Sequence, residues 1–135
     1  MNHWLVKSDP ETYGWQEFSK DKKTEWTGVR SYAARNHLRE MKKGDPILFY
    51  HSGKESAVVG TAKVSREFFP DPSSEEEAWV AIEMVVNKKF KRLVSLQEIK
   101  TVKELKDMVL IKISRLSVMP VTEAEFRKVE DLGTS

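Results

Sequence analysis

The sequence predicts an α+β fold in which strands form a small, partly closed antiparallel barrel and short helices pack around it. Three observations support this prediction. Several short apolar runs show the pattern of half-buried strands, three Ser/Thr-x-x-Glu patterns mark helix starts, and only one segment breaks the composition. With 135 residues, of which 39% are hydrophobic and 33% charged, the chain is long enough for one core.

Strands are expected wherever apolar residues recur at every second position or form short runs bounded by turn residues. The stretch 80–86 shows the alternation best, because Val80, Ile82 and Met84 give it one apolar face. Gly60 lies within an earlier apolar run and is a candidate β-bulge. The expected strands are residues 4–6, 47–51, 57–69, 80–86, 110–113 and 116–121.

A helix is expected over residues 31–42, where Ala34, Leu38 and Met41 fall on one face. Further helices are expected at capping boxes, in which a hydroxyl and a carboxylate satisfy free backbone N–H groups. The three boxes are Ser95-x-x-Glu98, Thr101-x-x-Glu104 and Thr122-x-x-Glu125. The apolar face of the last helix is expected to comprise Phe126, Val129 and Leu132.

The one break in composition is the segment 70–78, which is rich in proline, serine and glutamate. We expect it to be a surface loop within a single domain that spans residues 1–135. Its three consecutive glutamates make it a poor place to bind phosphate.

Several classes of protein leave signatures that this sequence lacks. There is no cysteine, so disulfides, thiolate metal sites and cysteine nucleophiles are excluded. No secretion signal and no run of about 20 apolar residues is present, so we expect no membrane partner and a cytoplasmic protein, nuclear if the source is eukaryotic. The net charge of +2 neither favours nor excludes a polyanionic partner.

Catalytic and cofactor motifs are not found either. His3, His37 and His51 are far apart and match no zinc-binding pattern, so we expect no metal and no cofactor. Sequence spacing alone leaves open a three-histidine site assembled in space. The segment around Lys54 fails as a phosphate-binding loop, because Leu48 stands where that motif needs glycine. We therefore expect a protein that is not an enzyme.

The segment 25–36 gathers side chains that are useful for binding nucleic acid. On the expected helix, Tyr32, Arg35 and Arg39 fall at i, i+3 and i+7, opposite the apolar face and beside Asn36. Arginine pairs with phosphate or a guanine edge, and exposed aromatic rings stack on unpaired bases. Asparagine offers a donor and an acceptor to a base edge.

The residues directly before this helix extend the group. Trp26 supplies a large ring, Gly28 a flexible turn and Arg30 a further guanidinium, close to backbone N–H groups that favour anions. The same pattern suits an ordinary structure, with Trp26 in the core and the arginines solvated or paired with acids such as Glu40. Spacing alone slightly favours that ordinary interpretation.

Four longer motifs, in order along the chain, are more specific. They are Trp4-Leu5-Val6-Lys7-Ser8-Asp9-Pro10, Glu25-Trp26-Thr27-Gly28-Val29-Arg30-Ser31-Tyr32-Ala33-Ala34-Arg35-Asn36, Leu48-Phe49-Tyr50-His51-Ser52 and Leu116-Ser117-Val118-x-Pro120-Val121. Together they resemble the EVE domain family over essentially the whole chain. The resemblance implies a PUA-like mixed or antiparallel pseudobarrel of about five to six strands with short surrounding helices, related to the PUA, ASCH and YTH folds.

The resemblance also implies a non-catalytic reader of nucleic acid, in which a modified base flips into an aromatic-lined pocket. The implied ligand is a modified cytosine in DNA or a modified RNA base. The residues that match the family motifs and are expected to bind it are Lys7, Ser8, Trp26, Val29, Arg30, Tyr32, Arg35, Asn36, Tyr50, His51, Ser52, Leu116 and Ser117.

Roles for these residues follow from their chemistry. Trp26 is expected to wall the pocket with a second aromatic ring, while Ser8 and Asn36 read the base edge. Arg30 and Arg35, together with the lysine before Ser8, are expected to hold flanking phosphate.

Ser31 and Ala33 depart from the family, which usually has Asn and Gln at these positions, and Asp9 stands where the family has Glu. The loss of two amides beside the pocket bears on which ligand is read and not on the fold.

Two details of the site depend on strand geometry. Only one of the two alternating faces of strand 47–51 can line a pocket, and we expect Tyr50 or His51 to lie near the ligand. The basic run 88–92 either follows phosphates beside the pocket or is an ordinary charged strand end.

Two functions from other classes stay open. An enzyme acting on nucleic acid or a nucleotide would use His51 as a general base, although no partner acid or nucleophile can be named from the sequence. A module that binds a small metabolite or a protein would use the same cavity and would show a weak salt dependence of binding.

Overall fold

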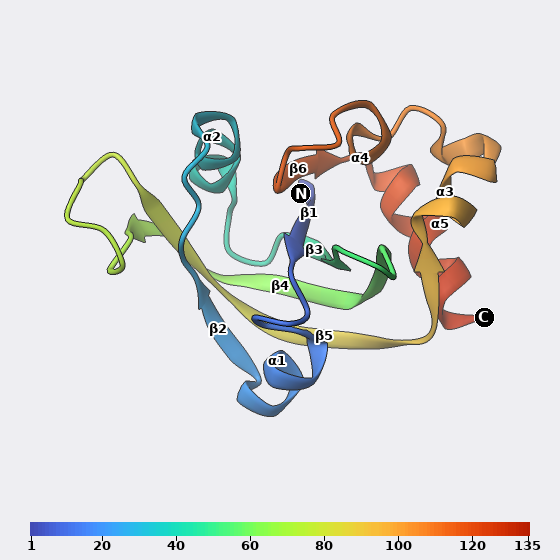
Figure 1. Ribbon diagram of the computed structural model, residues 1–135, viewed down its shortest axis with the longest axis horizontal. Helices are drawn as coiled ribbons and strands as arrows, with labels where there is room; N and C mark the ends of the chain where they lie inside the picture. Colours follow the sequence, from blue (N-terminus) through green and yellow to red (C-terminus); the bar gives the residue numbers. More distant parts are fainter.

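The computed structural model describes residues 1–135 and contains a six-stranded mixed sheet (Figure 1). The strands lie in the order β2-β5-β4-β3-β1-β6, in which β1 and β3 are parallel and the other neighbours are antiparallel. Their bounds are β1 His3–Ser8, β2 Lys23–Trp26, β3 Pro46–His51, β4 Ala57–Pro70, β5 Val80–Ser95 and β6 Val118–Val121.

Five α-helices lie around the sheet, which confirms the α+β fold. In the view of Figure 1, α2 and α1 lie at opposite ends of the molecule, and α5 runs beside β5 close to the C-terminus. No helix combines the length and the apolar character needed to cross a lipid bilayer. The bounds are α1 Trp15–Asp21, α2 Tyr32–Glu40, α3 Leu96–Thr101, α4 Val109–Lys112 and α5 Glu123–Thr134, with a 3₁₀ helix, η1, at Lys103–Leu105.

The sheet curls so that its β2 edge returns over its middle. β5 and β4 separate β2 from β3 in the strand order, yet the ring centre of Trp26 on β2 lies 5.8 Å from that of Phe49 on β3. Phe49 also packs on Trp15 and Phe18 of α1, with 5.4 and 5.1 Å between ring centres. This aromatic cluster fills the inside of the curl. The edge strands β2 and β6 do not pair with each other, so the barrel is open.

Gly60 lies at an irregularity of β4, where the register with β5 shifts between Val58 and Gly60, and this confirms the predicted bulge. A Cβ at this position would lie 2.5 Å from a ring carbon of Trp15 and 2.7 Å from the carbonyl oxygen of Lys88. Glycine is therefore required here by the close approach of its neighbours and not by an unusual backbone conformation.

The expected helix over 31–42 is confirmed as α2. Ser31 caps its N-terminus by accepting a hydrogen bond from the backbone N–H of Ala34, and Ala34, Leu38 and Met41 are all buried. The capping box at the start of α5 is complete, with hydrogen bonds in both directions between Thr122 and Glu125.

Two local predictions are wrong. Residues 110–113 form no strand and belong to α4 and its end, because the N–H groups of Ile111 and Lys112 both donate to the carbonyl of Met108 and close a helical turn. Thr101 begins no helix. It ends α3, and its hydroxyl donates to the carbonyl of Glu98.

Sequence analysis also missed α1 and β2. No side chain caps the start of α1, so its boundary has no local signal. β2 has only four residues and alternates exposed with half-buried positions, so it lacks a recognisable apolar run.

We predict that Gly60→Ala lowers the free energy of unfolding by about 1–3 kcal/mol, because the added methyl group meets both a packed indole and a backbone carbonyl. Urea denaturation followed by circular dichroism measures the loss. Gly14→Ala is the matched control, since its Cβ would find its nearest heavy atoms at 3.4 Å. An equal loss in the two variants would contradict the packing described for Gly60.

Candidate functional site

A hollow of about 470 Å³ opens beside the end of β2, and we call it the Trp26 hollow. It brings together three of the predicted site residues, Lys7, Ser8 and Trp26, from two strands that are not neighbours in the sheet. Its lining comprises Lys7, Ser8, Asp9, Thr12, Tyr13, Thr24, Glu25, Trp26 and Thr27.

Two aromatic rings form walls of the Trp26 hollow. Trp26 is half-buried, and its ring packs on Phe49 inside the curl of the sheet. Tyr13 stands beside it with 6.5 Å between ring centres and 67° between ring planes. The hydroxyl of Tyr13 donates to Oδ2 of Asp21 at 2.9 Å, which fixes the ring, and burial raises the pKa of this phenol. Tyr13 is therefore a neutral, fixed aromatic wall.

Ser8 and Lys7 are neighbours on β1, so their side chains leave opposite faces of the strand. The Ser8 hydroxyl donates to the carbonyl of Tyr13 at the Trp26 hollow. The Lys7 ammonium instead donates to the carbonyl of Ser114 at 2.7 Å and lies 5.7 Å from the ring centre of Tyr50. Burial lowers the pKa of Lys7. Lys7 thus lines the edge of the hollow while its charge is directed elsewhere.

Strand alternation also separates Tyr50 from His51. Tyr50 is buried against Lys7, whereas the ring of His51 lies 5.8 Å from that of Phe49, on the inner face of the strand. His51 Nε2 accepts a hydrogen bond from the backbone N–H of Trp15 at 3.0 Å. Burial lowers the pKa of His51, so the ring is held neutral with its proton on Nδ1.

His51 and Ser52 line a second hollow of about 500 Å³, which shares Asp9 with the Trp26 hollow. The N–H of Ser52 donates to the carbonyl of Ser8 at 2.9 Å and ties the end of β3 to the end of β1. His51 and Ser52 are therefore next to the Trp26 hollow but do not line it.

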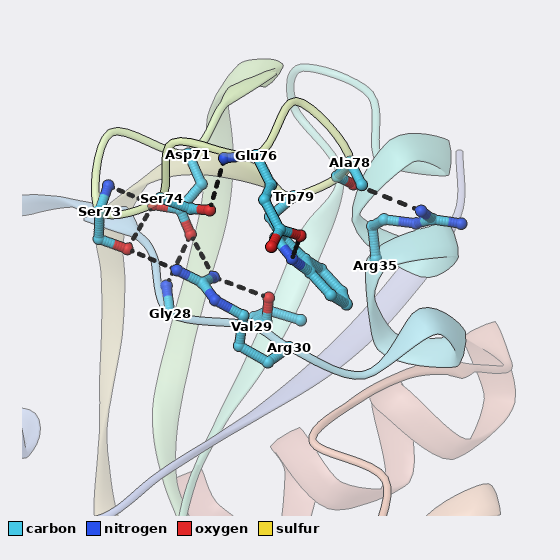
Figure 2. Close-up of polar contacts among 10 residues, drawn as sticks. All are labelled: Gly28, Val29, Arg30, Arg35, Asp71, Ser73, Ser74, Glu76, Ala78 and Trp79. Carbon is cyan, nitrogen blue, oxygen red and sulfur yellow. Dashed lines mark hydrogen bonds and ion pairs between the residues drawn. The ribbon is translucent and has the colours of Figure 1, made fainter.

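Arg30 is held by a buried carboxylate from the loop that follows β4 (Figure 2). Its Nη1 donates to Oδ2 of Asp71 at 2.9 Å, and its Nη2 donates to Ser73 Oγ at 3.1 Å. The same Asp71 oxygen accepts from the N–H of Gly28 at 2.9 Å. Asp71 thus fixes the turn that follows Trp26, and Arg30 already has a charge partner.

The ionisation of Asp71 is strongly favoured. Burial opposes the charge, but hydrogen bonds from Ser73, from Arg30 and from the N–H of Gly28 outweigh it and lower the pKa from 3.8 to about 2.

Tyr32, Arg35 and Asn36 lie together on α2, away from the Trp26 hollow. The Arg35 guanidinium lies 4.9 Å from the ring centre of Tyr32 and donates to Oδ1 of Asn36 at 3.0 Å. Trp79 lies between the guanidiniums of Arg30 and Arg35 (Figure 2), and its ring centre is 5.2 Å from that of Tyr32. This group forms a separate surface.

The remaining predicted site residues contribute to the core or to backbone hydrogen bonding and do not line the Trp26 hollow. Val29 and Leu116 are buried in the core, and the carbonyl of Ser117 accepts from the N–H of Lys7 at 2.9 Å. In the basic run 88–92, Lys88 pairs with Glu130 at 3.7 Å and Arg92 pairs with Glu98 at 2.8 Å. No group of three or more His, Asp or Glu side chains is close enough to hold a metal ion.

Sequence reasoning missed Tyr13, Asp71 and Trp79. Tyr13 follows the first strand in a segment without a motif. Asp71 and Trp79 lie in and directly after the segment expected to be a surface loop, although both are buried. The proline before Asp71 was the one local sign of a fixed backbone, and the partner, Arg30, is 41 residues away.

Comparisons with known proteins point to one family. The family model described as the EVE domain matches residues 2–132. Human thymocyte nuclear protein 1 is 35% identical, over 93% of this chain and 71% of that protein. The crystal structure of human THYN1 in complex with 5-methylcytosine containing DNA has a TM-score of 0.91 at 34% identity and covers 100% of this chain and 99% of that chain.

A more distant structure shares the fold alone. The YTH domain of Zygosaccharomyces rouxii MRB1, solved in complex with N6-methyladenosine RNA, has a TM-score of 0.62 at 14% identity, over 99% of this chain and 85% of that chain.

We predict that Asp71 contributes about 2 kcal/mol of stability that depends on its charge, because its pKa is lower in the folded chain than in the unfolded chain. This contribution is complete above about pH 4 and is lost as the pH falls through about 2. Urea unfolding of the wild type and of Asp71→Asn, measured across this range, tests it. The two free energies of unfolding should converge as the pH falls, and a constant difference would contradict the assignment.

Proposed function

The chain belongs to the EVE domain family, and on that premise we propose that it reads nucleic acid without catalysis, by taking a modified base into the Trp26 hollow. The base would flip out of its strand and stack against an aromatic wall. Modified DNA or RNA is then the partner, and a modified cytosine is the first candidate ligand.

The observation that carries this proposal is a pair of aromatic rings in a hollow of suitable size. Small-ligand pockets occupy about 300–1000 Å³, and the Trp26 hollow has about 470 Å³. A planar base that stacks parallel to the Trp26 ring would lie at 67° to the ring plane of Tyr13, which suits an edge-to-face contact between the base and Tyr13. Human THYN1, which this chain resembles along its whole length, was solved with DNA that contains 5-methylcytosine.

The polar groups of the hollow favour a base that carries an amino group. Ser8 lines the hollow and donates its proton to the carbonyl of Tyr13, so its hydroxyl oxygen is left to accept a hydrogen bond. Asp9 uses Oδ1 for the N–H of Glu11, which leaves its Oδ2 without a hydrogen-bond partner in the protein. Carboxylates accept hydrogen bonds from the N4 amino group of cytosine. This supports cytosine over thymine or uracil.

The energy balance requires contacts outside the hollow. Flipping a base out of a duplex costs a few kcal/mol, and stacking on one aromatic ring returns about 1–3 kcal/mol. Stacking thus offsets much of the cost without exceeding it clearly. Phosphate contacts elsewhere on the protein must supply further affinity, and single-stranded sites should bind more tightly than duplex sites.

The hydrogen bonding of His51 does not favour the alternative function, an enzyme that uses His51 as a general base. A general base needs a free lone pair, but Nε2 of His51 already accepts from the N–H of Trp15, and its proton lies on Nδ1. No Asp or Glu forms a hydrogen bond with this ring to orient it. The metabolite-binding alternative shares the hollow, and a steep salt dependence of binding distinguishes nucleic acid from it.

We predict that Trp26→Ala weakens binding to an oligonucleotide with a central 5-methylcytosine by about 5- to 150-fold, the equivalent of one lost stacking contact. Fluorescence anisotropy with labelled single strands measures the change. The unmodified oligonucleotide should lose much less affinity, because its contacts to phosphate remain.

Trp26→Phe is the matched control, since it keeps an aromatic wall and the packing on Phe49. It should retain most of the preference for the modified base. If Trp26→Ala remains folded and discriminates between the two oligonucleotides as the wild type does, the base does not bind in this hollow.

A further inference from the structure

We propose that the outer face of α2 is a second nucleic-acid surface, which binds the unpaired nucleotides that flank the modified base. This inference rests on the proposed function and adds where the nucleic-acid strand on either side of the modified base would bind. The surface, called here the α2 face, comprises Tyr32, Arg35, Arg39, Phe68 and Trp79.

The α2 face carries the two most exposed aromatic rings of the protein. Tyr32 is 64% exposed and Phe68 is 47% exposed, whereas every other Phe, Tyr and Trp is buried or half-buried. Tyr32 begins α2, and Phe68 on β4 lies beside the end of the same helix through Arg39. Solvated aromatic rings of this kind are the groups on which unpaired bases stack.

Both rings are held in place by arginines of α2. The guanidinium of Arg35 lies 4.9 Å from the ring centre of Tyr32, and that of Arg39 lies 5.9 Å from the ring centre of Phe68. Trp79 packs against Tyr32 at 30° between ring planes. These contacts restrict the motion of the rings and guanidiniums before a ligand arrives, which reduces the entropy lost on binding.

The two arginines are free of acidic partners. Arg35 donates only to neutral acceptors, Asn36 Oδ1 and the carbonyl of Ala78, and no ion pair includes Arg39. Arg30, by contrast, is paired with Asp71. Of the arginines expected to bind phosphate, Arg35 is therefore the one without an acidic partner. Arg39, which was not among them, is unpaired as well.

Two acidic side chains beside this surface, Glu67 and Glu76, have partners other than its arginines. Glu67 accepts from the N–H of Lys43 and lies 4.0 Å from the ammonium of Lys42. Glu76 accepts from the indole N–H of Trp79 at 3.1 Å. The guanidiniums are therefore left to complement the charge of a phosphodiester backbone.

Direct contacts connect the α2 face to the Trp26 hollow. Thr27 lines the hollow, and the next residue, Gly28, donates its N–H to Asp71. The N–H of Asp71 in turn donates to the carbonyl of Trp79, whose ring packs on Tyr32. Tyr32 is five positions after Thr27 in the chain, so their Cα atoms lie within about 18 Å, a distance that a few nucleotides span.

The test compares a trinucleotide with a nonanucleotide, each carrying the same central 5-methylcytosine, by anisotropy over a range of salt concentrations. The wild type should bind the longer strand more tightly. Tyr32→Ala with Phe68→Ala should remove at least about fivefold of this gain, which corresponds to one lost base stack. Arg35→Gln with Arg39→Gln should reduce the slope of log K against log salt by about 1.4, the value for two phosphate contacts on a single strand.

Two control variants match these changes. Tyr32→Phe keeps the ring and should bind as the wild type does. Lys103→Gln with Arg127→Gln removes two charges near α5, far from α2 in Figure 1, and should leave most of the salt slope intact.

The outcomes separate this inference from the proposed function. If the longer strand gains the same affinity in the wild type and in both α2 variants, the flanking nucleotides do not bind this face and the inference is overturned. A salt slope that the arginine variant leaves unchanged also overturns it, because Arg35 and Arg39 would then make no contact with phosphate. If the wild type shows no preference for the modified base, the proposed function fails, while the length and salt effects still decide the role of the α2 face.

Discussion

The packing of Phe49 inside the curled sheet is the interaction on which the rest of the structure depends. Its ring lies against Trp15 and Phe18 of α1 and against Trp26 of β2, although β2 is three positions away from β3 in the sheet. This contact holds the curl of the open barrel and brings the end of β2 to the end of β1. The Trp26 hollow exists between those two ends, so its shape follows from the core beneath it. A ring that is fixed on one side by the core offers its remaining surface to a ligand.

The charged residues divide into those that hold the site and those that remain free to bind. The buried Asp71 carboxylate pairs with the partly exposed Arg30 and also accepts the N–H of Gly28. The two residues therefore stabilise the turn after Trp26. Lys7 is turned toward a backbone carbonyl on the other face of β1. Arg35 and Arg39 have no acidic partner. Under the proposed function, the base would be read in the Trp26 hollow, and the flanking strand would bind to the neighbouring α2 face.

Local patterns in the sequence predicted much of the fold, because α2 and the capping box at Thr122 depend on residues close together in the chain. The bulge at Gly60 was also predicted, although the residues that require glycine there, Trp15 and Lys88, are distant in the chain. The same patterns failed at α4, where three apolar residues in a row suit a strand and a helical turn equally well. Contacts between residues far apart in the chain could not be predicted from these local patterns. Nothing near Arg30 or Asp71 in the sequence shows that they pair, and the only local sign of a fixed backbone in this loop was the proline before Asp71. The family motifs located Ser8 and Trp26 at the hollow, but Tyr13 belongs to no motif, and strand alternation decided that Lys7 and Tyr50 face away.

The central claim is that a modified base leaves its stack and enters the Trp26 hollow. The most direct measurement is a crystal structure of the protein with a single-stranded oligonucleotide that contains 5-methylcytosine. The account predicts the modified base against the ring of Trp26 or Tyr13, with its N4 amino group within about 3.2 Å of a carboxylate or hydroxyl oxygen of the lining. A complex in which the modified base lies outside the hollow, with only solvent against Trp26, would contradict it.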